Sequence, residues 1–253
     1  MTGVEQVRDM AAVASPGRLS RGWHAVLAVV VTAAFAGQLY LLAHGVTELD
    51  PAASEQGVGV AVRLGRLVSY FTIESNLLVL ATAVMLVLSP DRDGRLWRVL
   101  RLDALLGIVI TGLVFGLVLA PLVHPTGLGA WVNAGFHYFS PWWTLLGWVL
   151  FGPRPRVSRA TAVAAFAWPL AWIGYTFAHG AVSGWYPYPF LDAATIGYAH
   201  ALRNTAVIFV FAVLLAVLFT LLDRVRTVDR APAGAARAGR TGRPRPRAGS
   251  QTG

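Results

Sequence analysis

Long apolar stretches with few charges dominate this chain. A run of about 20 apolar residues is long enough to cross a bilayer as a helix, and in lipid a helix satisfies its own backbone hydrogen bonds. Six stretches reach or approach that length: 23–43, 67–88, 102–123, 135–151, 160–178 and 204–222. We therefore predict an all-α polytopic integral membrane protein of six transmembrane helices, located in the cell membrane.

The composition supports a chain that is embedded in lipid. Of its 253 residues, 56% are hydrophobic and 13% are charged, whereas soluble domains carry about 25% charged residues. The chain has no cysteine, which excludes disulfides, thiolate metal sites and a cysteine nucleophile. A water-soluble globule is excluded by the shortage of polar surface.

The positions of the arginines predict the orientation of the chain in the membrane. All 21 basic residues are arginine, and 18 of them fall in 1–22, 89–101, 152–159 and 224–253. The other segments between predicted spans carry only Arg63, Arg66 and Arg203. Because cytoplasmic loops are enriched in Lys and Arg, this asymmetry predicts that both termini are cytoplasmic.

The predicted spans divide the chain into a cytoplasmic N-terminal segment, 1–22, a six-helix domain, 23–223, and a C-terminal tail, 224–253. The tail holds eight arginines and one acidic residue among Pro, Gly and Ala. Such a composition cannot bury enough apolar surface to fold. We expect a disordered tail beside anionic lipid head groups. Most of the net charge of +9 is therefore a tail property, and we do not expect nucleic acid as a partner.

Small residues and prolines within the spans predict how the helices pack. Gly112 and Gly116 form a G-x-x-x-G pattern, which lets helices approach closely in lipid. Pro169 is expected to kink its helix or mark a cavity. No repeat of fixed period is found, which disfavours an ordinary secondary transporter.

Polar side chains inside a span are costly and indicate function. In the second span Ser69, Thr72, Ile73 and Asn76 share one helical face. Glu74 points elsewhere, and we weigh a functional role for it against a structural pair with Arg203. His137 lies at a similar depth in the fourth span.

A Thr and a His at similar depth suggest a nucleophile and its base. A threonine hydroxyl needs a neighbour that removes its proton, and a neutral imidazole can do so. An oxyanion formed on an ester carbonyl would then need donors. The candidates are Asn76, Tyr188 and Arg203, with His200 as a further polar residue of the same outer region.

Three short motifs, in order along the chain, resemble a known family. The first is YFT at 70–72, the second is Trp131, Asn133, Gly135 and His137, and the third is Gly184 followed by YPFL at 188–191. They resemble the androgen-induced-gene family of membrane threonine hydrolases. YFTIESNLL, H-x-x-x-P and YPYPFLD look closer still to the bacterial Pr6Pr family of six-helix membrane proteins, over about residues 23–222.

The resemblance implies a catalytic pair and a substrate class. It maps the family's threonine onto Thr72 and its histidine onto His137, and it implies fatty-acid esters of hydroxy fatty acids as substrates. This sequence departs from the family pattern in three places. The asparagine stands one residue further along, at Asn76, Pro141 follows His137 by one residue fewer, and Glu74 is not part of the motif.

Two other functions compete with a lipid ester hydrolase. A transporter, or a protein that binds lipid or its head group, would use a cluster of Glu74, Arg203, His179 and His200. A metal or haem protein would draw on His137, His179, His200, Asp192 and Glu74. No H-E-x-x-H or close His pair occurs, so we expect neither a metal nor another cofactor.

Overall fold

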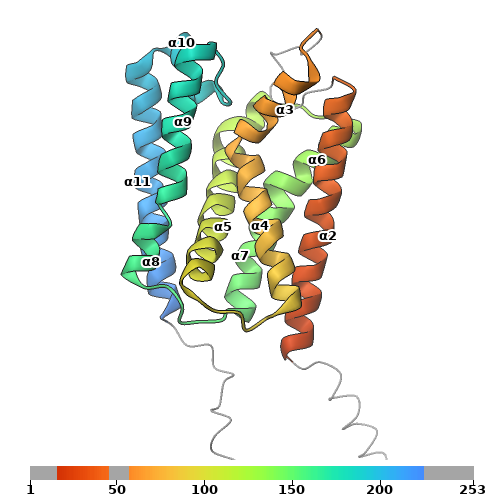
Figure 1. Cartoon of the computed structure of the whole chain (residues 1–253), viewed down its shortest axis with the longest axis vertical. Helices are drawn as coiled ribbons and strands as arrows, with labels where there is room; N and C mark the ends of the chain where they lie inside the picture. The colour runs from red at the N-terminus through yellow and green to blue at the C-terminus, as the bar shows by residue number, and fades with distance from the viewer. Residues whose placement is uncertain (1–15, 46–56, 225–253) are drawn as a thin grey trace, which may run out of the picture.

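The computed structural model describes residues 16–45 and 57–224 (Figure 1). Residues 1–15, 46–56 and 225–253 lie outside it, and with them most of the N-terminal segment and nearly all of the predicted tail. Within the described ranges every regular element is a helix. The prediction of an all-α chain is confirmed for this part of the protein.

Five helical stretches are long and apolar enough to cross a membrane: Gly17–Ala43, Phe71–Leu88, Arg95–Leu122, Arg159–Ser183 and Tyr198–Asp223. They correspond to the first, second, third, fifth and sixth predicted spans. The fourth predicted span falls in α6 (Gly127–Ala134), η3 (Gly135–Phe139) and α7 (Ser140–Phe151). These three elements follow one another without a gap.

The helices extend beyond the apolar runs that predicted them. α2 (Pro16–Ala43) and α5 (Arg95–Val114) both begin seven residues before their predicted starts, at 23 and 102. α11 (Tyr198–Asp223) begins six residues before residue 204. Hydropathy marks the apolar part of a helix, whereas the polar first turns remain helical outside that part.

The second predicted span is not one helix. It consists of α3 (Val60–Ser69) and α4 (Phe71–Leu88), separated by Tyr70 in an extended conformation, with φ −74° and ψ 126°. The break frees the Ser69 carbonyl, which accepts a hydrogen bond of 3.0 Å from the Trp172 indole. The prediction of a continuous helix over 67–88 is therefore wrong at Tyr70, where a new helix N-terminus begins.

Two prolines accompany π-helical turns. Pro141 has no N–H to donate to the carbonyl of His137, four residues earlier, and the π turn η3 (Gly135–Phe139) lies there. Pro121 stands in the same relation to Leu117, within the π turn η1 (Phe115–Leu119), which leads into η2 (Ala120–Leu122). Both turns thus follow from the missing donors.

Pro169 has the predicted effect on its helix. α8 (Arg159–Ala164) ends five residues before this proline, and α9 (Ala167–Ser183) begins two residues before it. A proline at position 169 cannot donate to the carbonyl of Ala165, which lies in the junction. Pro169 also lines a cavity, so the helix is interrupted before this proline and the predicted cavity is found.

Glycines allow some of the helices to approach closely. A Cβ on Gly112 would lie 2.8 Å from the Pro141 side chain, and one on Gly107 would lie 2.9 Å from the Ser75 hydroxyl. α5 therefore packs tightly against α7 and α4. Gly116 has open space beside it, so only Gly112 of the predicted G-x-x-x-G pair makes a close contact.

The helices form an elongated bundle (Figure 1). α4 packs mainly against α5 and α2, while α8, α9 and α11 stand along one side. α10 (Ala193–Ile196) and η4 (Pro189–Leu191) lie in the connection between α9 and α11. α2 begins and α11 ends at the same end of the bundle, which is the lower end in Figure 1.

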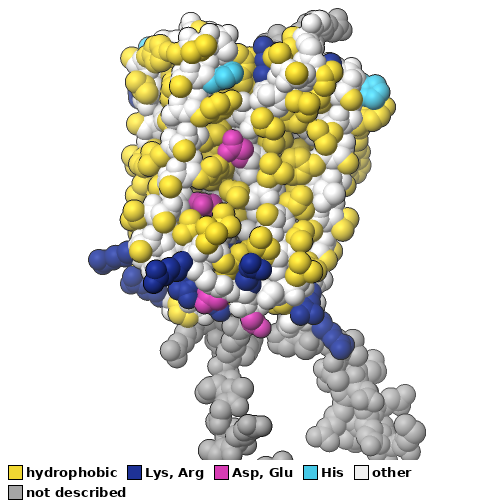
Figure 2. Space-filling model, in the orientation of Figure 1, with side chains coloured by type: hydrophobic (Ala, Val, Ile, Leu, Met, Phe, Trp, Pro, Cys, Tyr) yellow, Lys and Arg dark blue, Asp and Glu magenta, His cyan; other side chains and the backbone are white. Residues whose placement is uncertain are grey.

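Basic side chains gather near that lower end, whereas much of the remaining surface is apolar (Figure 2). Asp93, in the loop between α4 and α5, bonds Arg98 through both carboxylate oxygens at 2.7 Å and Arg156 at 2.7 Å. These contacts, with Arg98 contributing most, hold the pKa of Asp93 well below its ordinary value. The carboxylate ties the loop after α7 to the start of α5.

Candidate active site

Thr72 lies in the first turn of α4, directly after the break at Tyr70. Its side chain is buried, with 3% of its surface exposed. The first amides of a helix have no acceptor within the helix, and they lie at the positive end of its dipole. The break therefore gives Thr72 a backbone N–H with no acceptor in its own helix, in addition to its hydroxyl.

His137 faces Thr72 from the π turn η3. Its Nε2 lies 3.4 Å from the Thr72 Oγ1, and the residue is only 2% exposed. The imidazole stacks on the ring of Phe115, with centroids 4.0 Å apart and an angle of 19° between the rings. Phe115 begins the π turn η1, so both proline-associated turns contribute to holding this histidine.

Tyr188 completes the group from the loop before η4. Its phenol oxygen lies 3.2 Å from the Thr72 Oγ1 and accepts a hydrogen bond of 3.1 Å from the Thr72 N–H. Burial raises the pKa of Tyr188 to about 12, so the phenol stays protonated at neutral pH. It therefore has a proton to donate.

These contacts define a consistent order of donors and acceptors. Because the Tyr188 oxygen already accepts from the Thr72 amide, its O–H is free to donate to the Thr72 Oγ1. The Thr72 O–H then donates to Nε2 of His137, which requires the proton of the neutral imidazole to be on Nδ1. The His137 Nδ1 is buried and makes no hydrogen bond within the described residues.

Asn76 supports the site without facing a substrate. Its Nδ2 donates to the Thr72 carbonyl at 2.9 Å and to the Phe136 carbonyl at 3.4 Å. These bonds tie α4 to the turn that carries His137. Both amide hydrogens of Asn76 are thereby used, so it is a positioning residue, and the prediction that it donates to an oxyanion is not supported by this geometry.

Glu74 is turned away from Thr72, as its helical position predicts. Its Oε2 accepts a hydrogen bond of 2.6 Å from the Trp168 indole. The predicted pair with Arg203 is not formed, because Arg203 is exposed on α11. Glu74 therefore links α4 to α9.

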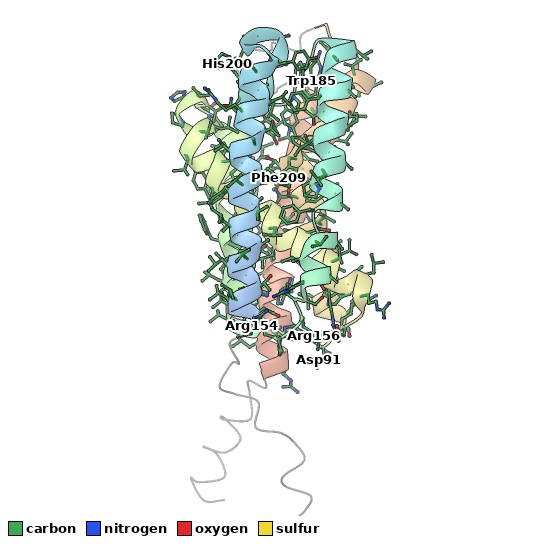
Figure 3. All side chains as sticks on the ribbon, turned by 90° about the vertical axis from the view of Figure 1, so that its left-hand side faces the viewer. Asp91, Arg154, Arg156, Trp185, His200 and Phe209 are labelled. Atoms are coloured by element: carbon green, nitrogen blue, oxygen red, sulfur yellow. The ribbon has the colours of Figure 1, made fainter. Side chains whose placement is uncertain are left out.

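Two further predicted site residues lie apart from Thr72. His200 is exposed, and its Nδ1 lies 3.0 Å from the Ile196 carbonyl. Figure 3 places it near the upper end of the molecule. Neither His200 nor Arg203 lines the cavity beside Thr72, so the predicted cluster of Glu74, Arg203, His179 and His200 does not form. The described residues contain no group of three or more His, Asp or Glu side chains that could hold a metal.

A large cavity adjoins the site between α4, α5, α9 and α11. It contains about 960 Å³ of space not filled by atoms, part of it open to the outside. Thr72 and Tyr188 form part of its wall, and most of the remaining wall is apolar, including Leu106, Phe209 and Ala212. Figure 3 labels Phe209 midway along α11. The cavity suits a hydrocarbon chain whose polar group lies at Thr72.

Three functional neighbours were missed in the sequence. Phe115 and Trp168 are aromatic residues within apolar spans, where nothing in the pattern separates them from ordinary packing residues. Asp103 is different, because it is an acidic residue within a predicted span and therefore costly. Asp103 is only one residue inside the predicted third span, which starts at 102, so the sequence pattern places it at the end of that span. Because α5 begins at Arg95, Asp103 in fact lies two turns within the helix.

No family model, curated protein or solved structure matches this chain. The fold defines the class of protein: its described residues are all-helical and include five helices of membrane-spanning length. The buried Thr–His–Tyr group beside an apolar cavity defines the site.

Proposed function

We propose that this protein is a six-helix membrane hydrolase that cleaves lipid esters with Thr72 as nucleophile and His137 as general base. The observation that carries the proposal is the buried Thr72 Oγ1, 3.4 Å from Nε2 of His137 and 3.2 Å from the Tyr188 oxygen, in the wall of an apolar cavity. The motif resemblance to membrane threonine hydrolases and the Pr6Pr family points to the same two residues.

The proposed topology has six crossings and cytoplasmic termini. Five crossings are the five long helices, and the remaining one, fourth along the chain, is the continuous run from α6 through α7, residues 127–151. The gathering of basic side chains at the end where α2 begins and α11 ends supports a cytoplasmic location for that end (Figure 2). Thr72, at the start of α4, then lies in the outer half of the membrane.

The first half of the reaction transfers the acyl group to Thr72. His137 Nε2 takes the hydroxyl proton while the Thr72 oxygen attacks the ester carbonyl carbon and forms a new C–O bond. The carbonyl electron pair moves onto its oxygen, giving a tetrahedral oxyanion. When this collapses, the C–O bond to the alcohol breaks, and the imidazolium returns the proton to the departing alkoxide.

The second half of the reaction uses water in place of the Thr72 hydroxyl. His137 takes a proton from water as the water oxygen attacks the acyl-threonine carbonyl. Collapse of the second tetrahedral intermediate releases the fatty acid and returns the proton to the Thr72 oxygen. Donors aimed at the oxyanion accelerate both halves. The Tyr188 O–H is the group placed to supply such a bond, because it is released once the Thr72 Oγ1 becomes an ester oxygen, whereas the Thr72 N–H stays bonded to the Tyr188 oxygen.

Turnover of a long-chain fluorogenic ester by the purified full chain tests this function. Thr72→Ala should lower kcat by about 1,000-fold or more, and His137→Ala by about 100- to 10,000-fold. Thr72→Ser keeps a hydroxyl in the same place and should retain measurable turnover. Glu74→Gln, on the same helix but bonded to Trp168, is the matched control and should behave as wild type.

A protein that only binds lipid is the second candidate, and the cavity favours it. That protein would also hold a fatty chain between α5, α9 and α11, but it would need no hydroxyl at position 72. Equal, low ester turnover in the wild-type, Thr72→Ala and His137→Ala proteins, with lipid binding retained in all three, would support this candidate and contradict the hydrolase.

A further inference from the structure

The cavity beside Thr72 is apolar except at a few positions, and polar atoms at three of them have no partner. Oδ1 of Asp103, Oγ1 of Thr111 and Oγ1 of Thr176 are buried and make no hydrogen bond within the described structure. All three residues line the cavity, and they are at most 5% exposed. Buried polar groups are nearly always bonded. Unpaired atoms also occur away from the cavity, such as Ser75 Oγ and Ser140 Oγ, so it is the position of these three on the cavity wall that makes them available to a ligand.

Asp103 is the most demanding of the three. A carboxyl group inside a span is costly unless it is paired or bonded. No hydrogen bond or ion pair to Asp103 is found among residues 16–45 and 57–224. By contrast, Glu74, the other acidic residue well inside a span, bonds to Trp168. Asp103 therefore lacks the kind of partner that Glu74 has.

Asp103 lies further along the cavity wall than the proposed nucleophile. Gly107 on α5 is level with Ser75 on α4, because a Cβ on Gly107 would lie 2.9 Å from the Ser75 hydroxyl. Thr72 is three residues from Ser75, and Asp103 is four residues from Gly107 in the opposite direction. At 1.5 Å per residue, Thr72 and Asp103 are about 10 Å apart along the helix axes. An extended chain advances about 1.2 Å per backbone atom, so about nine chain atoms would span the distance.

We propose that the cavity binds a long-chain lipid ester whose acyl chain ends in a hydrogen-bond donor, a hydroxyl or an amine, and that Asp103 accepts this donor. The inference rests on the proposed function for the position of the ester at Thr72. The chain would lie along α5, past Gly107 and Thr111. The apolar wall would hold its methylene groups, and Asp103 would distinguish a polar chain end from a methyl end.

Three fluorogenic esters of the same length, about nine chain atoms, test this proposal with methyl, hydroxyl or amino chain ends. The wild-type protein should give a kcat/KM for the hydroxyl- or amino-ended ester about 10-fold or more above that for the methyl-ended ester. Asp103→Leu should abolish or reverse this preference, and Asp103→Asn should reduce the preference for the amine most. Glu74→Gln, the matched acid outside the cavity wall, should leave the preference unchanged.

A short ester that cannot reach Asp103 controls for folding of the variants. Asp103→Leu should cleave it at the wild-type rate. If the wild-type protein cleaves all three long esters alike and Asp103→Leu keeps their relative rates, the chain-end proposal is overturned while the hydrolase stands.

A binding measurement separates this proposal from the hydrolase itself. A ligand that binds the folded state raises its Tm, so a long-chain alkanediol should raise the wild-type Tm more than the mono-alcohol of the same length. That difference should vanish in Asp103→Leu. If no ester is cleaved but the diol effect depends on Asp103, the proposed function fails while the polar chain-end site stands. Equal shifts for diol and mono-alcohol in the wild-type protein would contradict the site.

Discussion

At the scale of single residues, Thr72 is defined by what surrounds its two polar groups. Its hydroxyl lies between an imidazole that can accept a proton and a phenol that can donate one. Its amide has no acceptor within α4, because the helix begins there, and it donates to the Tyr188 oxygen instead. The three groups come from segments 65 and 116 residues apart in the chain, so only the fold brings them together.

Tyr188→Phe tests the role of the phenol. The ring and its packing against Tyr70 and Phe190 are kept, but the donor is lost. We expect kcat to fall by about 100-fold, with little change in KM, because an oxyanion donor acts mainly in the transition state. Steady-state kinetics check this. A raised KM at unchanged kcat would instead assign Tyr188 to ground-state binding.

The pH dependence provides a further test of Tyr188. Since burial raises its pKa to about 12, the phenol keeps its proton throughout the neutral and moderately alkaline range. The rate should therefore show no alkaline fall caused by Tyr188 until the pH approaches that value. A profile of kcat against pH measures this, and a fall near pH 10 that disappears in Tyr188→Phe would contradict the raised pKa.

The sequence pointed to residues that lie together in the structure where polarity itself was unusual. Thr72 and His137 were found because polar groups in apolar spans need a reason, and Tyr188 was one of three proposed donors. The prediction that Arg203 lies beside the site was wrong. Its place near the outer loop did not determine the direction in which its side chain points from α11. Phe115 carried no signal, since an aromatic ring in a span usually only packs.

At the scale of elements, three backbone irregularities build the site. The break at Tyr70 leaves the Thr72 amide without an acceptor in its helix. The π turn before Pro141 carries His137, and the π turn that begins at Phe115 carries the ring that stacks on His137. The two π turns follow from prolines that are plain in the sequence. The break does not, because tyrosine is no helix breaker and the Trp172 indole that bonds Ser69 comes from a distant helix.

Pro141→Ala tests the link between the π turn and the histidine. An alanine supplies the missing N–H to the His137 carbonyl, so η3 can become regular α-helix. His137 would then rotate relative to Thr72. We expect a loss in kcat of about 100-fold with thermal stability equal to or above the wild type, as measured by turnover and Tm. Full activity would show that the turn does not position the imidazole.

At the scale of the whole molecule, hydropathy predicted the helical class and most of the long helices, but it predicted the helix ends poorly. The described residues are all-α. Five of the six predicted spans correspond to helices of membrane-spanning length. The fourth falls in a helical run interrupted by a π turn. Helix ends were predicted poorly because polar turns at the membrane surface remain helical while their hydropathy resembles that of loops.

The proposed six-span topology can be tested directly because the chain has no cysteine. Single cysteines at Ser158, between α7 and α8, and Ser183, at the end of α9, would report on opposite ends of the bundle. In intact cells a membrane-impermeant maleimide should label Ser183→Cys only, and permeabilised cells should add Ser158→Cys. The reverse pattern would invert the proposed orientation, and equal labelling of both in intact cells would contradict it.

The most direct test of the central claim is covalent capture of the nucleophile. The full chain in detergent is treated with a long-chain fluorophosphonate, and the modified residue is located by mass spectrometry of its peptides. A single adduct on Thr72, lost in Thr72→Ala and strongly slowed in His137→Ala, is the result that a Thr72 nucleophile activated by His137 predicts. No adduct in the wild-type protein, or an adduct that persists on another residue in Thr72→Ala, would contradict it.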